Sequence, residues 1–188
     1  MDDYVWFDAL KKSIRKNKRL RENRYFQLAT VSKYGFPANR TVVFRGFTKD
    51  SHSIKVITDS RSKKLEEIKS NPLCEICWYF NVTREQFRIR AEGRIFDQSS
   101  SDKRLGTWAE LTGSAKEQFF WPAPGRPIES TSCDSKLDLA VEEDVPETFV
   151  LLELQPIAVD HLQLKGSSQT RILSSVNSGV WVSSAVHP

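Results

Sequence analysis

Strict alternation of apolar and polar residues between Glu85 and Phe96 is the feature that most constrains the fold of this chain. The apolar series contains Phe87, Ile89, Ala91 and Ile95, and the positions between them are mostly charged or amide residues. A period of two is the period of a β-strand, whose successive side chains point to opposite faces. This segment therefore predicts a strand with one buried face and one that is exposed or functional.

Other segments repeat this pattern, with β-branched and aromatic residues between turn signals. We expect strands at residues 25–31, 38–47, 53–58, 73–80, 85–96, 148–154 and 158–164, and weaker ones near 171–173 and 180–182. Helices are expected over about 3–20, capped by Asp2 or Asp3, over a short stretch capped by Ser60 or Ser62, and from about 99 toward 112. A long loop is expected at about 121–147.

Many short strands with few helices favour a mainly β fold with flanking helices. An antiparallel, Greek-key-like barrel is the form we expect, because closure removes exposed sheet edges. With 188 residues, one core is enough, so we expect a single domain over residues 1–188. Neither a βαβ alternation nor a G-x-G-x-x-G sequence is visible, which argues against a Rossmann or P-loop nucleotide site.

Composition narrows the class of protein further. A hydrophobic fraction of 39% and a charged fraction of 28% are typical of a soluble globular chain. No apolar run approaches the ~20 residues of a membrane span, and the start does not resemble a secretory signal, so a cytoplasmic location is expected. Cys74 and Cys77 lie three apart on a predicted strand and should face opposite ways, so we expect reduced thiols and no metal site.

The formal net charge of +4 raises the question of a nucleic-acid partner. The basic residues crowd into positions 11–24, and acidic residues crowd into positions 134–147, so the basicity is local. A charged run on a first helix is usually a solvated face. A basic barrel that binds nucleic acid therefore remains one of the functional hypotheses.

Basic and hydroxyl side chains gather at strand ends and at one helix start between residues 40 and 86. Ser62-Lys63-Lys64 falls at the predicted N-terminus of a helix, where free amide groups and the positive end of the dipole favour an anion. Two lysines are unfavourable for the helix itself at that end, and such local conflicts mark functional sites. The pattern predicts a site for a phosphorylated cofactor.

In order and spacing these segments resemble the pyridoxamine 5′-phosphate oxidase-like, FMN-binding split-barrel family. That family repeats an Arg-x-Val-x-x-(Lys/Arg) strand, a Tyr-Thr-Asn strand end, a Ser-Arg-Lys helix start and an Arg-Gln-(Val/Phe)-Arg strand. The corresponding segments here are Arg40-Thr41-Val42-Val43-Phe44-Arg45, Ile57-Thr58-Asp59, Ser62-Lys63-Lys64 and Glu85-Gln86-Phe87-Arg88.

The resemblance implies an FMN cofactor and a homodimer with FMN at the subunit interface. It implies that Arg40, Ser62, Lys63 and Lys64 hold the FMN phosphate, and that Thr58 and Gln86 hydrogen-bond the phosphate, the ribityl chain or the flavin edge. It also implies that Arg45 lies near the flavin ring and that Trp121 or Arg171 reaches the cofactor from the partner chain. The matching segments bring Thr41, Val42, Val43 and Ile57 into the expected site.

Arg40 and Arg45 are an odd number of positions apart, so a regular strand would place them on opposite faces. A bulge near Gly46, or a site built from two subunits, would bring them together. The oxidase that gives the family its name holds its substrate phosphate with a Tyr-Phe-x-x-Arg-Pro segment and a C-terminal Arg-Leu-His. This chain has residues 107–111 and Thr170-Arg171-Ile172-Leu173 instead, which leaves the substrate open.

Three functions therefore follow from the sequence. The first is an FMN-dependent oxidoreductase resembling pyridoxamine 5′-phosphate oxidase, and the second is a flavin-binding carrier or sensor without turnover of its own. The nucleic-acid-binding barrel is the third.

Overall fold

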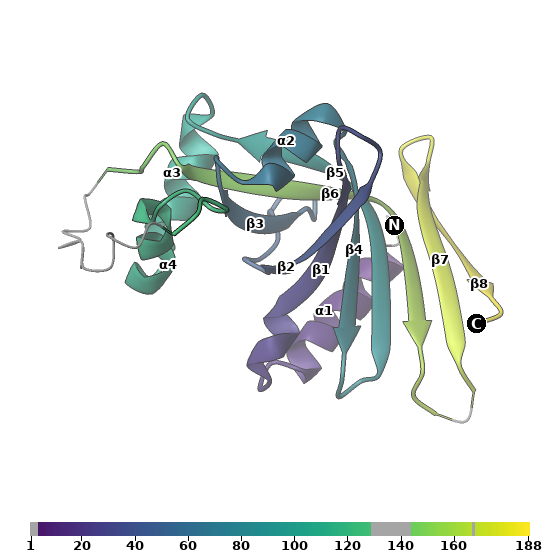
Figure 1. Ribbon diagram of the computed structural model, residues 1–188. Coiled ribbons are helices and arrows are strands. Elements are labelled where there is room, and N and C mark those ends of the chain that lie inside the picture. The colour runs from purple at the N-terminus through teal and green to yellow at the C-terminus, as the bar shows by residue number, and fades with distance from the viewer. Residues whose placement is uncertain (1–3, 129–143, 167) are drawn as a thin grey trace.

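The computed structural model describes residues 4–128, 144–166 and 168–188, and these residues form a bent antiparallel sheet with helices around it (Figure 1). The strands are β1 (Tyr25–Val31), β2 (Pro37–Val43), β3 (Ile54–Asp59), β4 (Leu73–Phe80), β5 (Glu85–Phe96), β6 (Phe149–Gln163), β7 (Thr170–Asn177) and β8 (Val180–Val186). The helices are α1 (Val5–Lys16), α2 (Lys63–Ser70), α3 (Ser101–Ala109) and α4 (Gly113–Glu117), with short 3₁₀ turns η1 (Arg21–Arg24) and η2 (Gln118–Phe120).

Six of the strands close into a barrel. The sheet runs in the order β2-β1-β4-β5-β6-β7-β8, and β3 pairs with β6. Beyond the end of β2, the amide of Arg45 donates to Lys55 O at 2.9 Å and the amide of Lys55 donates to Gly46 O at 2.8 Å. These bonds join β2 to β3 and complete a ring in which β4, β1, β2 and β3 lie in Greek-key order. The expected mainly β, Greek-key-like barrel is confirmed.

Two strands are much longer than the rest, and both bend. The pairing of β5 with β6 shifts register between Arg90 and Ala91, close to Pro156, whose ring nitrogen cannot donate to a ladder. Residues 149–154 of β6 pair with β3, and residues 158–163 pair with β7. The separate strands expected at 148–154 and 158–164 are therefore one bent strand. Its first part pairs within the barrel, and its second part pairs with the β7–β8 hairpin.

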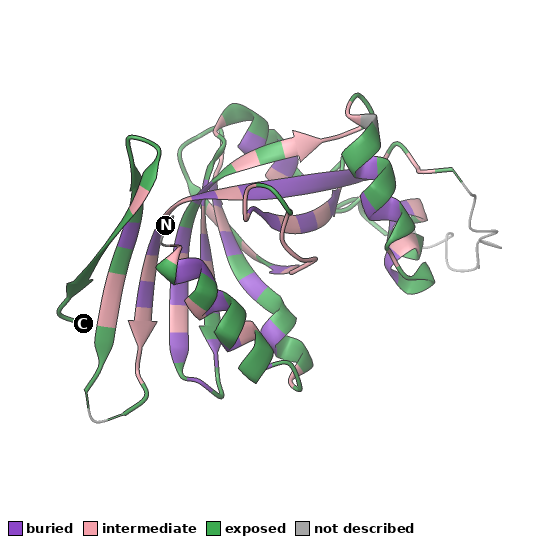
Figure 2. Cartoon of the chain, turned by 180° about the vertical axis from the view of Figure 1, so that it is seen from behind, coloured by how far each residue is buried: buried purple, intermediate pink, exposed green. Residues whose placement is uncertain are grey.

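The inward-facing apolar side chains that alternate along β4 and β5 fill the barrel interior, as expected. Ile76, Trp78, Phe87 and Ile89 are fully buried and belong to the main core cluster. A smaller second cluster joins Trp108 with other rings beneath α3 and η2. Figure 2 shows the first part of β6 as a nearly unbroken purple band, and the buried residues of α1 as separate purple patches among exposed green ones.

The first helix is shorter than expected, spanning 12 residues, and Tyr4 occupies its N-cap without a side-chain cap bond. Asp2 and Asp3, the expected caps, lie outside the described residues. The buried stripe of α1 is Trp6, Phe7, Leu10 and Ser13, whereas Val5 is exposed. The helical period places Phe7 and Leu10, three apart, on the same face, and that face meets the core.

Much of the expected long loop, residues 129–143, lies outside the described part of the chain, as does Cys133. Cys74 is buried and Cys77 half-buried, and both are free thiols, as the opposite faces of a strand require. Burial raises the pKa of Cys74 to about 12. Within residues 4–128, 144–166 and 168–188, no helix combines the length and the apolar character needed to cross a membrane.

Asn17 fastens the end of α1 to the turn between β4 and β5. Its side-chain amide donates to Ser13 O at 2.8 Å and to Thr83 Oγ1 at 3.2 Å, and its Oδ1 accepts from the amide of Val82 at 2.9 Å. Asn17→Ala removes all three bonds at a buried site, so the free energy of unfolding should fall by about 2–3 kcal/mol in urea denaturation. The exposed neighbour Lys18→Ala should change it by less than about 0.5 kcal/mol, and equal effects would contradict this role for Asn17.

Candidate functional site

A cleft opens where β2 and β3 part. The two strands are joined near Arg45 and Lys55, and they diverge toward Arg40 and Asp59. The opening has a volume of about 450 Å³ and is closed on its other sides by the start of α2 and by η2 with the segment after it. The residues that we predicted and that line it are Arg40, Thr41, Val42, Val43, Arg45, Ile57, Thr58, Ser62, Lys64 and Trp121.

The cleft exposes one edge of β2 to a ligand. The amide of Phe44 donates to Arg24 O on the β1 side, and the amide of Arg45 donates to Lys55 O on the β3 side. Because successive amides of a strand point to alternate sides, the amides of Thr41 and Val43 point the same way as that of Arg45. Two backbone donors thus face the opening where β3 has moved away.

This edge also explains how Arg40 and Arg45 reach one cleft. The register between β1 and β2 is regular from Val31–Pro37 to Tyr25–Val43, so no bulge separates the two arginines. Gly46 does have a positive φ of 105°, but it follows both residues. The expected bulge is therefore not the explanation: the cleft lies along the open edge of β2 and takes side chains from both faces.

Hydroxyl and ammonium groups converge at the α2 end of the cleft. Lys64 Nζ donates to Thr58 Oγ1 at 2.7 Å, and Thr58 Oγ1 lies 3.2 Å from Ser62 Oγ. Ser62 is the N-cap residue of α2, so the free amides of the first turn open beside these groups. Burial, and next the charge of Arg40, lowers the pKa of Lys64. The carboxylates of Asp59 and Glu67 partly offset these two effects. A half-buried ammonium beside another cation is an arrangement that a further anion stabilises.

Arg40 is held in place by a group that the sequence analysis missed. Its Nη2 lies 2.7 Å from Glu67 Oε2, its Nη1 donates to Leu28 O at 3.2 Å, and Thr30 Oγ1 accepts a further bond from Nη1. Glu67 lies three residues after Lys64 on α2, so the two side chains lie on the same face of the helix. This spacing is the only feature of the sequence that could have placed Glu67 near the predicted site. Arg40 therefore faces the cleft with its orientation already fixed.

Trp121 lines the cleft from a segment fastened by an ion pair. Arg61 Nη2 lies 2.6 Å from Asp59 Oδ2 and also donates to Trp121 O at 3.0 Å. Burial raises the pKa of Asp59, but the hydrogen bonds from Arg61 outweigh it and hold the pKa below its usual value. The end of β3 thus positions a half-exposed indole over the opening.

Arg45 supplies a positive charge at the far end of the cleft. Five residues of extended strand separate it from Arg40, or about 16 Å. Its Nε is buried and has no hydrogen-bond partner among the described residues. Burial, and next the charge of Arg24, lowers the pKa of Arg45. The cleft therefore has two cationic ends, joined by the open edge of β2.

The remaining predicted residues do not line this cleft within one chain. Lys63 is exposed on the first turn of α2, and Gln86 is half-buried on β5, opposite Tyr79 and Leu162. Arg171 lies on β7, in a second hollow of about 340 Å³ on the outer face of the sheet. Their roles toward a cofactor stay predictions.

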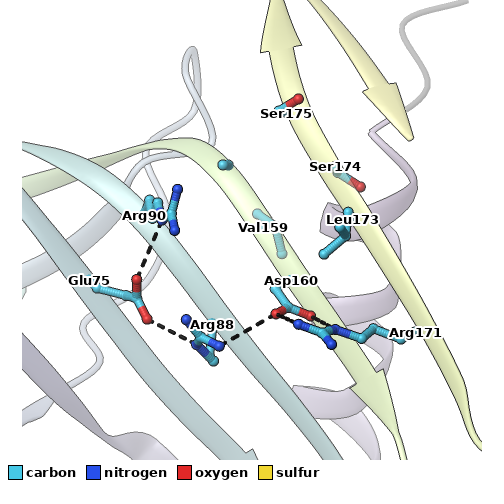
Figure 3. Close-up of a pocket in the computed structure, with 10 residues that line it drawn as sticks. Glu75, Arg88, Arg90, Val159, Asp160, Arg171, Leu173, Ser174 and Ser175 are labelled. Carbon is cyan, nitrogen blue, oxygen red and sulfur yellow. Dashed lines mark hydrogen bonds and ion pairs between the residues drawn. The ribbon is translucent and has the colours of Figure 1, made fainter. Parts of the chain in front are cut away.

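Figure 3 shows that this second hollow is lined by charges that satisfy one another. Arg171 holds Asp160 with two bonds, Nε–Oδ1 at 2.9 Å and Nη2–Oδ2 at 2.8 Å. Arg88 connects Asp160 to Glu75, which Arg90 also approaches. Because these charges are paired with one another, the hollow offers a ligand a polar surface and little uncompensated charge.

Within residues 107–111, which replace a substrate-binding segment of the resembled oxidase, Thr107 and Trp108 turn inward, whereas Ala109 and Glu110 are exposed. Trp108 packs edge-to-face on Phe119 and Phe149, and Thr107 is buried with its hydroxyl donating to Lys103 O. Neither side chain lines the cleft. This part of α3 supports the second core cluster.

The donor set fits FMN. Lys64, Arg40 and the hydroxyls of Thr58 and Ser62 suit a phosphate monoester at the start of a helix, and the open edge of β2 suits the polar rim of a flat ring. The buried, unpartnered Nε of Arg45 lies where the ring would end. A dianionic phosphate at one end, and at the other a ring that gains negative charge when it is reduced, match the two cationic ends.

Comparisons with known proteins test the family assignment. Residues 3–97 match the family described as pyridoxamine 5′-phosphate oxidase, FMN-binding domain. A relative from Arabidopsis thaliana, pyridoxine/pyridoxamine 5′-phosphate oxidase 2, is 37% identical over 97% of this chain and 96% of its own length. Pyridoxine/pyridoxamine 5′-phosphate oxidase from Zymomonas mobilis is 27% identical over 97% of this chain and 94% of its own length.

Two solved structures extend the comparison. A pyridoxamine 5′-phosphate oxidase-related, FMN-binding protein from Nostoc punctiforme superposes over all of both chains with a TM-score of 0.89 and 40% identity. PhzG from Burkholderia lata, at 17% identity, shares the fold with a TM-score of 0.81 over all of this chain and 94% of its own. The chain belongs to the pyridoxamine 5′-phosphate oxidase-like, FMN-binding split-barrel family, and its cofactor is FMN.

Proposed function

We propose that this protein is an FMN-dependent oxidoreductase in which residues 1–188 form a single FMN-binding domain. The observation that carries the proposal is the cleft along the open edge of β2, with Lys64 and Arg40 at one end and Arg45 at the other. Its relatives include proteins named as oxidases of pyridoxine and pyridoxamine 5′-phosphate, which makes those esters the first substrates to test.

In this proposal each part of the cleft has one task. Lys64, Arg40, Ser62 and Thr58 bind the FMN phosphate, and the exposed Lys63 adds long-range attraction. Two bonds from the amides of Thr41 and Val43 orient the ring, while Val42 and Ile57 contact its apolar surface. Trp121 covers the opening and excludes water.

FMN supplies the redox chemistry, accepting a hydride from the substrate when bound. Arg45 would place a fixed cation beside the ring, where a partly buried positive charge favours the anionic, reduced form of a flavin. We place the protein in the cytoplasm, where free thiols such as Cys74 and Cys77 stay reduced.

The proposal predicts a yellow protein that releases FMN, rather than FAD, when it is purified without added cofactor and then denatured. Anaerobic addition of pyridoxamine 5′-phosphate, pyridoxine 5′-phosphate, or other amine, aldehyde or nicotinamide donors should bleach the flavin absorbance with at least one of them. Flavin that is bound but bleached by none of these donors would favour a carrier or sensor. A colourless protein that cannot be loaded with FMN would exclude both functions.

Lys64→Ala should weaken FMN binding by about tenfold or more, because a charge-assisted bond to phosphate contributes about 1.5–3 kcal/mol. The measurement is the quenching of FMN fluorescence on titration of apoprotein. Lys69→Ala is the matched control, since Lys69 is an exposed lysine in the last turn of the same helix. Equal affinities for the two variants would remove Lys64 from the phosphate site.

The variant Lys64→Arg separates the effect of the positive charge at position 64 on FMN affinity from the effect of side-chain packing there. Burial lowers the pKa of Lys64 in the FMN-free protein, so wild-type affinity should be full below that pKa and decline as pH rises through it. Arginine stays protonated, so Lys64→Arg should retain its affinity to higher pH.

We further propose a homodimer in which Gln86 and Arg171 reach the cleft of the partner subunit. Neither residue lines the cleft of its own chain, and the β7–β8 hairpin presents exposed apolar side chains that a second copy would cover, namely Leu173, Val176, Val180, Val182 and Val186.

Sedimentation velocity should therefore show a dimer at micromolar concentration, and Val182→Asp should shift it toward the monomer and weaken FMN binding. Val5→Asp, which adds the same charge at an exposed position of α1, should do neither. A monomeric wild-type protein that still binds FMN tightly would contradict the shared site.

A further inference from the structure

Behind the α2 end of the cleft lies a carboxylate to which the proposed function assigns no role. Glu67 does not line the cleft, although Arg40 and Lys64 both do. Its side chain is 12% exposed, and its Oε2 lies 2.7 Å from Arg40 Nη2. Glu67 therefore contacts a cation of the cleft from the side away from a ligand, and it can act on that ligand only through other residues.

Arg40, Thr30 and Glu67 form a closed ring of hydrogen bonds. Thr30 Oγ1 accepts from Arg40 Nη1 and donates its own proton to Glu67 Oε2 at 2.5 Å, and the same Oε2 accepts from Arg40 Nη2. The three residues come from β1, β2 and α2, and Thr30 is fully enclosed by them and their neighbours. Because each member is bonded to the other two, the ring fixes the plane of the guanidinium group.

The ring uses only part of the donor set of Arg40. A guanidinium group has five N–H donors in a rigid plane. Nη1 donates to Thr30 Oγ1 and to Leu28 O, and Nη2 donates once, to Glu67. Within the described part of the chain, the N–H of Nε and the second N–H of Nη2 have no acceptor, so two donors on neighbouring nitrogens are left for a ligand in the cleft.

We propose that Glu67 is a positioning residue of the FMN phosphate site: from behind the cleft, its carboxylate holds the guanidinium group of Arg40 in the orientation that binds the phosphate. This role rests on the proposed function, in which the phosphate binds at this end of the cleft. Without an acceptor at position 67, the long side chain of Arg40 would sample several orientations, and FMN would have to restrict it on binding at an entropic cost. The bond to Glu67 meets that cost during folding.

The charge of Glu67 has a second effect, on Lys64. Burial and the charge of Arg40 lower the pKa of Lys64, whereas the charges of Asp59 and Glu67 raise it. The charged groups that face this ammonium are thus Arg40 from β2, Asp59 from the end of β3 and Glu67 from α2 itself. Loss of the carboxylate at position 67 should lower the pKa of Lys64 further, so Lys64 should lose its proton at a lower pH.

The experiment compares two uncharged replacements of Glu67 in FMN-free, full-length protein. Glu67→Gln keeps an acceptor oxygen for Arg40, whereas Glu67→Ala removes it, so the difference between the two variants reports the acceptor and not the charge. FMN binding is followed by the quenching of its fluorescence, and riboflavin, which lacks the phosphate, is titrated in parallel.

Two further variants complete the set. Glu66→Ala is the matched control, because Glu66 is an exposed carboxylate in the first turn of the same helix. Thr30→Val removes the hydroxyl group from the ring at nearly constant volume, and it tests the same ring if Glu67→Ala does not fold.

Glu67→Ala should bind FMN about tenfold more weakly than Glu67→Gln near neutral pH, while riboflavin binds equally to both. Thr30→Val should also bind FMN more weakly than the wild type, with riboflavin binding unchanged. As the pH is raised, Glu67→Gln should lose its FMN affinity at a lower pH than the wild type does, because Lys64 no longer has the carboxylate that favours its protonated form. Glu66→Ala should match the wild type in every titration.

Equal FMN affinities of the two Glu67 variants would overturn this role for Glu67 alone, and where Glu67→Ala does not fold, wild-type FMN affinity of Thr30→Val would do the same. Weaker binding of riboflavin together with FMN by Glu67→Ala would indicate damage to the whole cleft and would also overturn it. If Lys64→Ala binds FMN as tightly as the wild type, the phosphate assignment in the proposed function fails, and the role of Glu67 fails with it.

Discussion

The arrangement of the whole site depends on where β2 stops pairing with β3. Two backbone bonds, from Arg45 to Lys55 O and from Lys55 to Gly46 O, join the strands at one end. On the other side of that joint the strands separate, although β3 stays paired with β6 and β2 with β1. A closed barrel has no free edge, so a ligand that needs backbone donors can bind only where the closure is incomplete. In the proposed site, the split would provide both the space and the amides for the flavin ring.

The cationic residues at the split are costly for the isolated protein. Lys64 is the second residue of α2, where a positive charge opposes the helix dipole, and it is also half-buried. The structure limits this cost with a neutral acceptor and two carboxylates: Thr58 accepts from Lys64, Glu67 pairs with Arg40, and the charge of Asp59 acts on Lys64. Cations that are partly neutralised in this way leave the fold stable without a ligand, and a bound dianion would stabilise the site further.

Local pattern was enough to predict the frame. The bounds expected at residues 25–31, 73–80 and 85–96 agree with β1, β4 and β5, because those strands alternate over their whole length and end at clear turn signals. The single strand β6 was missed, because Pro156 interrupts the pattern in the middle and only tertiary pairing with β3 and β7 carries the strand across it. Most predicted site residues do line one cleft.

The parts of the site that the sequence did not reveal are those that depend on contacts between distant segments. Glu67 pairs with Arg40, Arg61 fastens Trp121, and η1 reaches Arg45, and each contact joins residues more than 20 positions apart. The basic segment 11–24 shows the same limit. Its composition predicted a solvated face, and the lysines of α1 as well as Arg21 and Arg24 are exposed, but these two arginines also lie beside Arg45 at the end of β2.

That division of the basic segment follows from a few buried bonds. Asn17 ends α1, and Asn23 fixes η1 to Asn17 and Trp78, so the chain turns sharply between two anchored points. The basic residues before the turn lie on the helix surface, and those after it are also exposed but stand beside Arg45 at the end of β2. Net charge alone cannot distinguish these two positions, because the distinction is made by the asparagines, which are uncharged. The turn thus carries part of the basic segment to the Arg45 end of the cleft.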